Sequence, residues 1–388
     1  MGHEAVRVEP SWRARGRRIL VAWFAVSVAA FAYAQVVDVS VGRTRSYFVD
    51  ASGNVFESSS VAVPTRVWWL SNVTSVSAGG HHALARRRNG TVAAWGSGSS
   101  GQLGQPSSSD VRRVEQVQFP EGVRLEAVAA GYDFSIALTS HGHVYAWGSN
   151  RYGQLGDGTT TDRHEPARVA MIEDAVAIAA GQYHALALLR HGTVVAWGRN
   201  GDGQLGIGTY EGFETTPAPL EFSWELRWII GDGDVPIVRV IAASATADHS
   251  AAILDDGSVV TWGANRHAQL GNGSRAATAW ADVVPGVERA VAVAVGESNT
   301  YAVLQGGTVV AWASNDYGQL GDGSLRHRAG PTTVARIDDA VSVAAGRMNA
   351  IVVRADGSVM AWGRNGDGEL GTGDQVDRVV PERVVGWW

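Results

Sequence analysis

The 388-residue sequence contains no cysteine and no lysine. Without cysteine, the chain can form neither a disulfide framework nor a thiolate metal site. All 32 basic residues are arginines, which we interpret as a bias of composition typical of a GC-rich bacterial genome. Charged residues make up only 18% of the chain, and the net charge is −6. Such a chain is poorly suited to bind nucleic acid, because neutralisation of phosphates supplies most of that affinity, so we expect no nucleic-acid partner.

Sequence motifs that specify catalysis are missing as well. There is no serine nucleophile elbow, no phosphate-binding glycine loop that ends in lysine and no paired-histidine zinc motif. Residues 200–203 and 365–368 are similar to parts of a calcium-binding loop, but the glutamate that would complete such a loop is absent. We therefore expect a protein that is not an enzyme, with no catalytic, cofactor-binding or metal-binding residues and no cofactor.

The first 34 residues differ in composition from the rest of the chain. A stretch with several arginines precedes an uncharged apolar run over residues 19–33, and the run ends in Ala32-Tyr33-Ala34. These features predict a secretory signal peptide over residues 1–34. An uncleaved signal anchor is the alternative, although the run is shorter than the roughly twenty residues of a membrane span. We expect a secreted or periplasmic protein, attached to the membrane only if this segment is not cleaved.

The remainder of the chain is built from a repeat. Six of the 15 tryptophans follow one another at intervals of 52, 50, 65, 50 and 50 residues. A glycine stands five places before each of them, and a small residue stands sixteen places before. Self-similarity at a fixed period near fifty is typical of propellers and other arrays, so one structural unit has been copied. These structural repeat residues are Trp95, Trp147, Trp197, Trp262, Trp312 and Trp362, with Gly90, Gly142, Gly192, Gly257, Gly307 and Gly357.

Each copy predicts strands joined by tight turns. The glycine before the tryptophan lies between two apolar runs, often after Asn or Asp, which is typical of a β-hairpin turn. The Val/Ala run before the small residue, for example residues 175–180, predicts a third strand buried on both faces. After the tryptophan, most copies repeat Gly-Gln-Leu-Gly, as in residues 153–156, where two glycines indicate bends around a buried leucine. A polar loop then leads to a proline and a new strand.

This pattern resembles the regulator of chromosome condensation repeat family over about residues 36–388, nearly the whole chain after the leader. The resemblance rests on the joint spacing of the turn glycine, the Trp-Gly pair and the Gly-Gln-Leu-Gly turn. It implies an all-β fold, a seven-bladed β-propeller, and the leader predicts a bacterial secreted type. A seventh copy is needed, and Gly42 and Gly53 fall at its spacing, with Ser58 where the tryptophan would be.

We expect residues 35–388 to form a single, monomeric propeller of about fifty-residue repeats. The first copy lacks both the Gly-Gln-Leu-Gly turn and the strand after the proline, whereas residues 381–385 form a strand with no copy of their own to begin. The sequence therefore predicts that the N-terminal and C-terminal segments share one blade and close the ring, which removes exposed edges. Trp68, Trp69 and residues 387–388 lie near this closure, where we expect them to pack at the seam.

One polar position recurs three residues after the small residue that opens each copy. A catalytic histidine rarely occurs in several equivalent copies, so we interpret this position as a buried side chain that ties a strand to the neighbouring blade. The repeat tryptophans are interpreted likewise as core packing. The residues at this position are His82, Phe134, His184, His249, Asn299 and Asn349.

The 65-residue interval contains an insertion at about residues 221–235. Exposed aromatic residues with acidic neighbours on a rigid scaffold are typical of a protein-binding loop. Trp224, Trp228 and Asp232 are therefore candidate partner-binding residues, together with Trp280 in the next rim loop. The alternative is that Trp224 and Trp228 fold back and cap the rim of the propeller.

Three functional hypotheses remain open. The first is an exported, non-catalytic scaffold that binds a protein or cell-envelope partner through its rim loops; a secreted protein inhibitor of an enzyme is one form of it. The second is regulation of a small GTPase by guanine-nucleotide exchange, which the resemblance implies but the export signal disfavours. The third is an enzyme or a polysaccharide-binding module with a site in the central channel. We favour the first hypothesis.

Cleavage of the leader has a direct test. Mass spectrometry of the exported protein is expected to find Gln35 at the N-terminus, because the Ala-x-Ala end places the cleavage site after Ala34. Retention of residues 1–34 in the membrane fraction would show a signal anchor instead.

Overall fold

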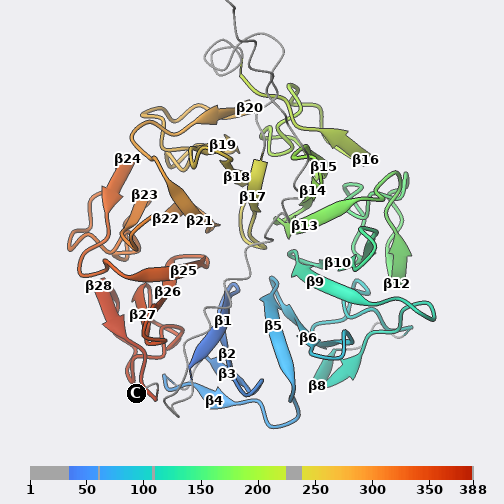
Figure 1. Ribbon diagram of the computed structural model, residues 1–388, viewed down its shortest axis with the longest axis horizontal. Helices are drawn as coiled ribbons and strands as arrows, with labels where there is room; N and C mark the ends of the chain where they lie inside the picture. The colour runs from blue at the N-terminus through green and yellow to red at the C-terminus, as the bar shows by residue number, and fades with distance from the viewer. Residues whose placement is uncertain (1–34, 60–61, 107–109, 224–237, 387–388) are drawn as a thin grey trace, which may run out of the picture.

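A computed structural model describes residues 35–59, 62–106, 110–223 and 238–386. In this part of the chain 28 strands form seven four-stranded antiparallel sheets, and no helix occurs. The sheets stand around a central axis, each with its first strand innermost (Figure 1). The described chain is therefore an all-β, seven-bladed β-propeller, as the repeat predicts. Within the same residues there is no helix with the length and apolar character needed to cross a membrane.

Each blade takes four consecutive strands of the chain. The strands of blades 1 to 4 are β1 (Val36–Val41), β2 (Ser46–Asp50), β3 (Val55–Ser58), β4 (Thr65–Arg66); β5 (Val73–Ala78), β6 (His82–Arg87), β7 (Val92–Gly96), β8 (Val111–Gln116); β9 (Leu125–Ala130), β10 (Phe134–Thr139), β11 (Val144–Gly148), β12 (Arg163–Arg168); β13 (Ala175–Ala180), β14 (His184–Leu189), β15 (Val194–Arg199) and β16 (Phe213–Pro219). Those of blades 5 to 7 are β17 (Val238–Ala242), β18 (His249–Leu254), β19 (Val259–Gly263), β20 (Thr278–Val283); β21 (Ala290–Val295), β22 (Asn299–Leu304), β23 (Val309–Ala313), β24 (Arg328–Thr333); β25 (Ala340–Ala345), β26 (Asn349–Arg354), β27 (Val359–Gly363) and β28 (Arg378–Arg383).

The hairpins between the second and third strands follow the predicted glycines. The turn glycine of blades 2 to 7 has a φ angle between 82° and 97°, in the left-handed region that glycine adopts without strain. Gly53 of blade 1 has a φ of 80° and forms the same turn, which confirms the seventh copy. The innermost strands are edge strands of their sheets and, contrary to the prediction from the sequence, are not buried on both faces along their whole length. On β21 and β25, for example, Val291 and Val341 are 40% and 39% exposed.

The prediction that the N-terminal and C-terminal segments share one blade is wrong. The strand after the proline belongs to the unit that precedes it: β28 pairs with β27, with Met360 opposite Arg383. Blade 1 has a fourth strand of its own, because β4 pairs with β3 through Phe56 and Arg66. In each blade the fourth strand runs antiparallel to the third strand, which in blades 2 to 7 carries the tryptophan. Each of the seven described sheets therefore has four strands from one continuous stretch of the chain.

Neighbouring blades are joined by a hydrogen bond that recurs around the ring. The indole Nε1 of the repeat tryptophan donates to the backbone carbonyl of the glutamine in the preceding blade's Gly-Gln-Leu-Gly turn. The indole is buried in each case, so the bond is shielded from water and contributes about 1 kcal/mol net. The five pairs are Trp147 to Gln102, Trp197 to Gln154 and Trp262 to Gln204, all at 2.9 Å, and Trp312 to Gln269 and Trp362 to Gln319, both at 2.8 Å.

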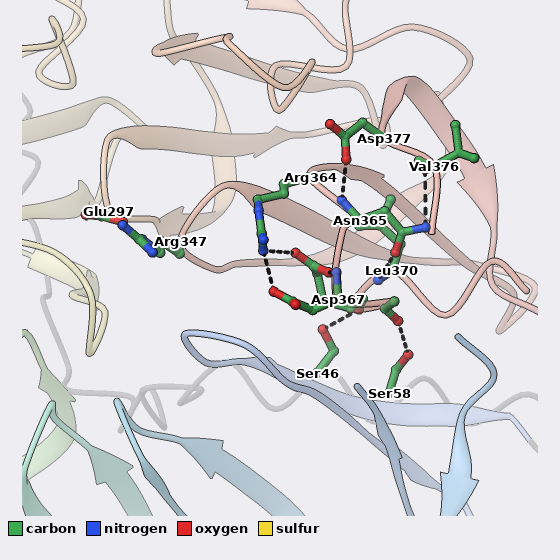
Figure 2. A network of polar contacts seen from close by, with 12 residues as sticks. Ser46, Ser58, Glu297, Arg347, Arg364, Asn365, Asp367, Leu370, Val376 and Asp377 are labelled. Atoms are coloured by element: carbon green, nitrogen blue, oxygen red, sulfur yellow. Dashed lines mark hydrogen bonds and ion pairs between the residues drawn. The ribbon is translucent and has the colours of Figure 1, made fainter. Parts of the chain in front are cut away.

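Two serines of blade 1 make the corresponding contact with blade 7. Ser58, at the tryptophan position, donates from Oγ to the carbonyl of Gly368 at 2.7 Å, and Ser46 donates to the carbonyl of Glu369 at 2.8 Å (Figure 2). Both serines are fully buried. Side-chain hydrogen bonds to the turn of blade 7, and not a shared sheet, therefore close the ring.

Replacement of Ser58 tests this closure. Ser58→Ala removes one of the two donors to the carbonyl of Gly368, which also accepts from the amide of Gly371 at 3.1 Å, and we expect the free energy of unfolding to fall by about 1 kcal/mol. Guanidinium denaturation followed by tryptophan fluorescence measures the change. Ser140→Ala, on an exposed hairpin of blade 3, is the matched control and should leave the midpoint unchanged. Equal stability of the Ser58 variant and wild type would contradict this account of closure.

Candidate binding face

The long loops of blades 2 to 7 emerge on one face of the propeller. Because neighbouring strands are antiparallel, the loop between the first and second strands and the loop between the third and fourth strands leave a blade at the same end. The hairpins between the second and third strands lie at the opposite end. We call the face that carries the long loops the loop face.

The predicted rim site is only partly described by the structure. Trp224, Trp228 and Asp232 lie outside the described residues. Trp280, on β20, is 42% exposed, and its ring meets Tyr210 of blade 4 edge-on with the centroids 6.5 Å apart. The insertion begins along blade 5, because the amide of Ser223 donates to the carbonyl of Ala281 at 2.9 Å. A role of Trp280 in partner binding stays a prediction.

The Asn-Gly-Asp-Gly loops use their asparagine internally. In blade 4, Nδ2 of Asn200 donates to the carbonyl of Thr209 at 2.9 Å, and its Oδ1 accepts from the amide of Leu205 at 3.2 Å. The oxygen that a calcium ligand would present is therefore occupied. Within the described ranges no group of three or more His, Asp or Glu side chains is placed to hold a metal ion.

This asparagine clamp is a feature that the sequence analysis missed. It recurs three places after the tryptophan in five blades, so its spacing was visible in the sequence. In each case Oδ1 accepts from the amide of the leucine five places on, which holds the Gly-Gln-Leu-Gly turn rigidly over the next blade. The clamps are Asn150, Asn200, Asn265, Asn315 and Asn365.

The repeated histidines tie blades together, as predicted. Nε2 of His82 lies 2.8 Å from Oγ of Ser135 in the next blade, and His184 and His249 make the same contact with Ser250 and Thr300. Burial lowers the pKa of each histidine to about 3. The imidazoles are therefore neutral near pH 7 and unsuited to acid–base chemistry there.

The blade with phenylalanine at the histidine position shows the alternative solution. Phe134 of blade 3 is followed in blade 4 by Ala185, at the position where Ser135 follows His82. Both are fully buried. A polar pair or an apolar pair thus occupies the same position in the seam, and the apolar pair avoids the buried Nδ1 that has no hydrogen-bond partner among the described residues in His82, His184 and His249.

A row of aromatic side chains crosses the loop face from blade 2 to blade 4. The ring of Tyr132 lies 5.2 Å from that of His81 and 5.6 Å from that of Tyr183, and Tyr183 lies 5.3 Å from Tyr152. The guanidinium of Arg151 stands 5.1 Å above the ring of Tyr152. We call these five residues the tyrosine row. The three tyrosines are half-buried, whereas His81 and Arg151 are exposed.

Ion pairs, in contrast, occupy the loop face of blades 4 to 7. Arg199 contacts Asp248 and Asp202, both at 2.8 Å, and Arg347 contacts Glu297 at 2.7 Å (Figure 2). Burial raises the pKa of Asp248, although Arg199 opposes the shift. Because these charges already have partners, blades 4 to 7 present a less available surface than the tyrosine row.

A cleft of about 870 Å³ opens on the loop face between blades 1 and 2. Only residues 59–64 join the third and fourth strands of blade 1, whereas residues 149–162 join those of blade 3. The missing part includes the Gly-Gln-Leu-Gly turn, which in the other blades covers the next tryptophan. Trp95 consequently lines the cleft, and it is the repeat tryptophan without a turn carbonyl above it in the described chain.

The walls of the cleft combine aromatic and charged side chains. Tyr47 meets Trp95 edge-on, with centroids 5.5 Å apart, and Arg45 pairs with Glu57 at 2.6 Å. Burial raises the pKa of Tyr47, so its hydroxyl keeps its proton. Trp69 also lines the cleft and is 54% exposed.

The prediction that Trp68 and Trp69 pack at a closing seam is therefore wrong for both. Trp68 is 73% exposed, and its ring carries the guanidinium of Arg66 at 4.4 Å.

The structure is a seven-bladed β-propeller whose blades share one repeated framework, and the seam between blades 1 and 2 differs from it by the cleft. A family model of the RCC1-like domain matches residues 57–280, and models of the regulator of chromosome condensation (RCC1) repeat match residues 306–353, 340–369 and 356–386. The first match covers more than half of the chain, so the chain belongs to the RCC1-like domain family.

The matches with curated relatives cover small parts of those relatives. The ultraviolet-B receptor UVR8 of Arabidopsis thaliana is 40% identical over 97 residues, which are 25% of this chain and 22% of the receptor. The E3 ubiquitin-protein ligase HERC2 of Homo sapiens is 30% identical over 335 residues, 71% of this chain and 7% of the ligase. The chain thus spans less than a quarter of either relative.

Solved structures with the same fold include two propellers. Human WBSCR16 has a TM-score of 0.73 and 24% identity, with 84% of each chain covered. Yeast RCC1 (Prp20), in a structure bound to Kap60, has a TM-score of 0.72 and 25% identity, with 84% of this chain and 80% of the yeast chain covered. These likenesses agree with the seven-bladed architecture.

The buried histidines predict acid lability. Below pH 6.5 the unfolded chain binds protons that the folded chain does not, so each histidine lowers stability as the pH falls from 6.5 toward 3. The double variant His82→Phe/Ser135→Ala copies the Phe134–Ala185 seam and removes one of these groups. Between pH 7 and pH 5 we expect it to lose about 2 kcal/mol less stability than wild type.

Urea denaturation at the two pH values measures this difference. The single variant His82→Phe is the control, because it removes the same titrating group but keeps the hydrogen bond that Ser135 donates to the carbonyl of Gln102 at 2.8 Å. It should show the same reduced pH dependence as the double variant. A double variant with the pH dependence of wild type would contradict the assignment.

Proposed function

We propose that the chain is an exported, non-catalytic propeller that binds a protein partner on the loop face of blades 1 to 4. The observation that carries the proposal is the tyrosine row, which is continuous with the cleft. Arg43 links the tyrosine row to the cleft. Its Nη1 donates to the hydroxyl of Tyr132 at 2.8 Å, and its side chain also lines the cleft. Export rests on the signal peptide expected over residues 1–34.

The chemistry of the row suits recognition of a protein. Tyrosine and arginine are enriched among the residues that carry binding energy at protein interfaces, because each combines an apolar surface with a polar end. The rings of Tyr132, Tyr183 and Tyr152 already contact one another, so little side-chain freedom is lost when a partner binds. Burial and the nearby Asp133 raise the pKa of Tyr183, whose hydroxyl is therefore a stable donor.

The comparisons support protein binding without naming the partner. Yeast RCC1 (Prp20) was solved bound to Kap60, and HERC2 is an E3 ubiquitin-protein ligase of which the match covers only 7%. A cell-envelope protein and an enzyme that the propeller inhibits are both partners of the proposed kind. Guanine-nucleotide exchange on a small GTPase is the second candidate: the likeness to yeast RCC1 favours it, whereas an exported chain would not meet cytosolic GTPases.

Capture of partners from the exported fraction of the source cells tests the proposal. Tyr183→Ala removes the central ring of the row, and Arg151→Glu reverses an exposed charge at its end without disturbing the core. We expect each to reduce recovery of the partner at least tenfold, as removal of a central interface residue commonly does. Quantitative mass spectrometry of the captured proteins measures recovery, and melting temperatures verify folding.

Trp280→Ala is the matched control, since it removes an exposed aromatic residue from the rim between blades 4 and 5. Full recovery with this variant and loss with Tyr183→Ala would support the loop face. The reverse pattern would reject the loop face and favour the rim loops predicted from the sequence. Acceleration of nucleotide release from a small GTPase would favour the second candidate.

A further inference from the structure

Blade 6 shows what the cleft between blades 1 and 2 lacks. The hydroxyl of Tyr301 donates to the carbonyl of Gln319 in the turn of its own blade at 2.7 Å. Nε1 of Trp362, from the next blade, donates to the same oxygen at 2.8 Å. Two buried donors from neighbouring blades therefore converge on one turn carbonyl.

Blade 1 repeats the two donors without the acceptor. Tyr47 occupies the repeat position of Tyr301, five residues after the small residue that opens the copy, and Trp95 occupies the position of Trp362. The rings of Tyr47 and Trp95 line the cleft and meet edge-on, as those of Tyr301 and Trp362 do with centroids 6.2 Å apart. In place of the peptide carbonyl of the other seams, the hydroxyl of Tyr47 has Trp95 and Arg45 as its neighbours, so the indole N–H and the phenol O–H stand at a cleft that lacks the turn.

Arginines line the cleft around these donors. Among the described residues, Arg43 contacts Tyr132 and His81, and Arg66 contacts the amide oxygen of Asn54 and the ring of Trp68. Neither guanidinium is paired with a carboxylate there, although the chain as a whole is acidic. In the same part of the chain, Nε of Arg66 is buried without a hydrogen-bond partner.

The dimensions agree with a peptide ligand. A volume of about 870 Å³ lies within the range of pockets that enclose ligands of several hundred daltons. The Gly-Gln-Leu-Gly turn that blade 1 lacks is followed in two other blades by an aspartate, Asp157 and Asp322.

We propose that the cleft binds an acidic peptide turn of a partner protein in the place that the missing turn of blade 1 would occupy. A backbone carbonyl of the turn accepts hydrogen bonds from Nε1 of Trp95 and the hydroxyl of Tyr47, and the aspartate carboxylate of the turn pairs with Arg66. This inference deepens the proposed function and rests on it, because it names the kind of segment that a partner on the loop face inserts.

A head-to-tail cyclised, fluorescein-labelled peptide that contains Gly-Gln-Leu-Gly-Asp-Gly, the sequence of residues 153–158, is the probe. Cyclisation holds the turn and reduces the entropy lost on binding. Fluorescence anisotropy should show saturable binding to the full chain. We expect Tyr47→Phe to weaken binding about fivefold through loss of one hydrogen bond, and Arg66→Gln to weaken it at least tenfold through loss of a charge-assisted one.

Tyr301→Phe is the matched control, because it removes the same hydroxyl at the same repeat position in blade 6, away from the cleft. It should leave the peptide affinity unchanged, and a peptide with Asn in place of Asp should bind as weakly to wild type as the Asp peptide binds to Arg66→Gln. Absence of saturable binding, or equal effects of Tyr47→Phe and Tyr301→Phe, would overturn the inference.

The two proposals fail separately. Capture of a partner that is sensitive to Tyr183→Ala, together with no binding of the peptide, would leave the loop face in place and reject the cleft as a peptide site. Peptide binding that depends on Tyr47, together with partner capture insensitive to Tyr183→Ala, would keep the cleft and reject the tyrosine row.

Discussion

The hydrogen bond from a buried indole to the turn carbonyl of the preceding blade is the interaction on which the propeller depends. The asparagine clamp and the glutamine side chain hold each turn, so its carbonyl is in place when the next blade packs against it; in blade 3, for example, Oε1 of Gln154 accepts from the amide of Tyr152. One contact then fixes both the angle between two blades and the position of the turn. Repetition of this contact explains why the same few residue types recur at one period.

Blade 1 departs from that rule on both of its sides, and the two departures have different consequences. Toward blade 7, Ser58 replaces the tryptophan but still reaches the turn of its neighbour, so the seam closes with a smaller donor. Toward blade 2, the turn itself is missing, so Trp95 keeps its place while its usual acceptor is gone. At the seams where the turn is present, its carbonyl accepts from the indole of the next blade. The cleft is where framework residues are left available to a ligand.

The local parts of the fold followed from the sequence, and the long-range parts did not. Hairpins were predictable because the turn glycine needs a positive φ angle, and Ser58 was found because repeat spacing survives the loss of a tryptophan. The pairing of β28 with β27 was missed, since spacing alone does not show to which neighbour a strand belongs. The two residues of β4 carry no pattern, and the tyrosine row joins residues of three blades that no periodicity relates.

The sequence by itself determined the blade number, the framework tryptophans and glycines and the interpretation of the repeated histidines, because these depend on contacts copied at a constant interval. The tertiary structure alone decided how the ring closes, which strand completes each blade and what the absence of one turn produces. A missing segment leaves no residue to interpret in a sequence. In the folded chain it becomes a cleft, because the neighbouring blade keeps the shape that the segment would have covered.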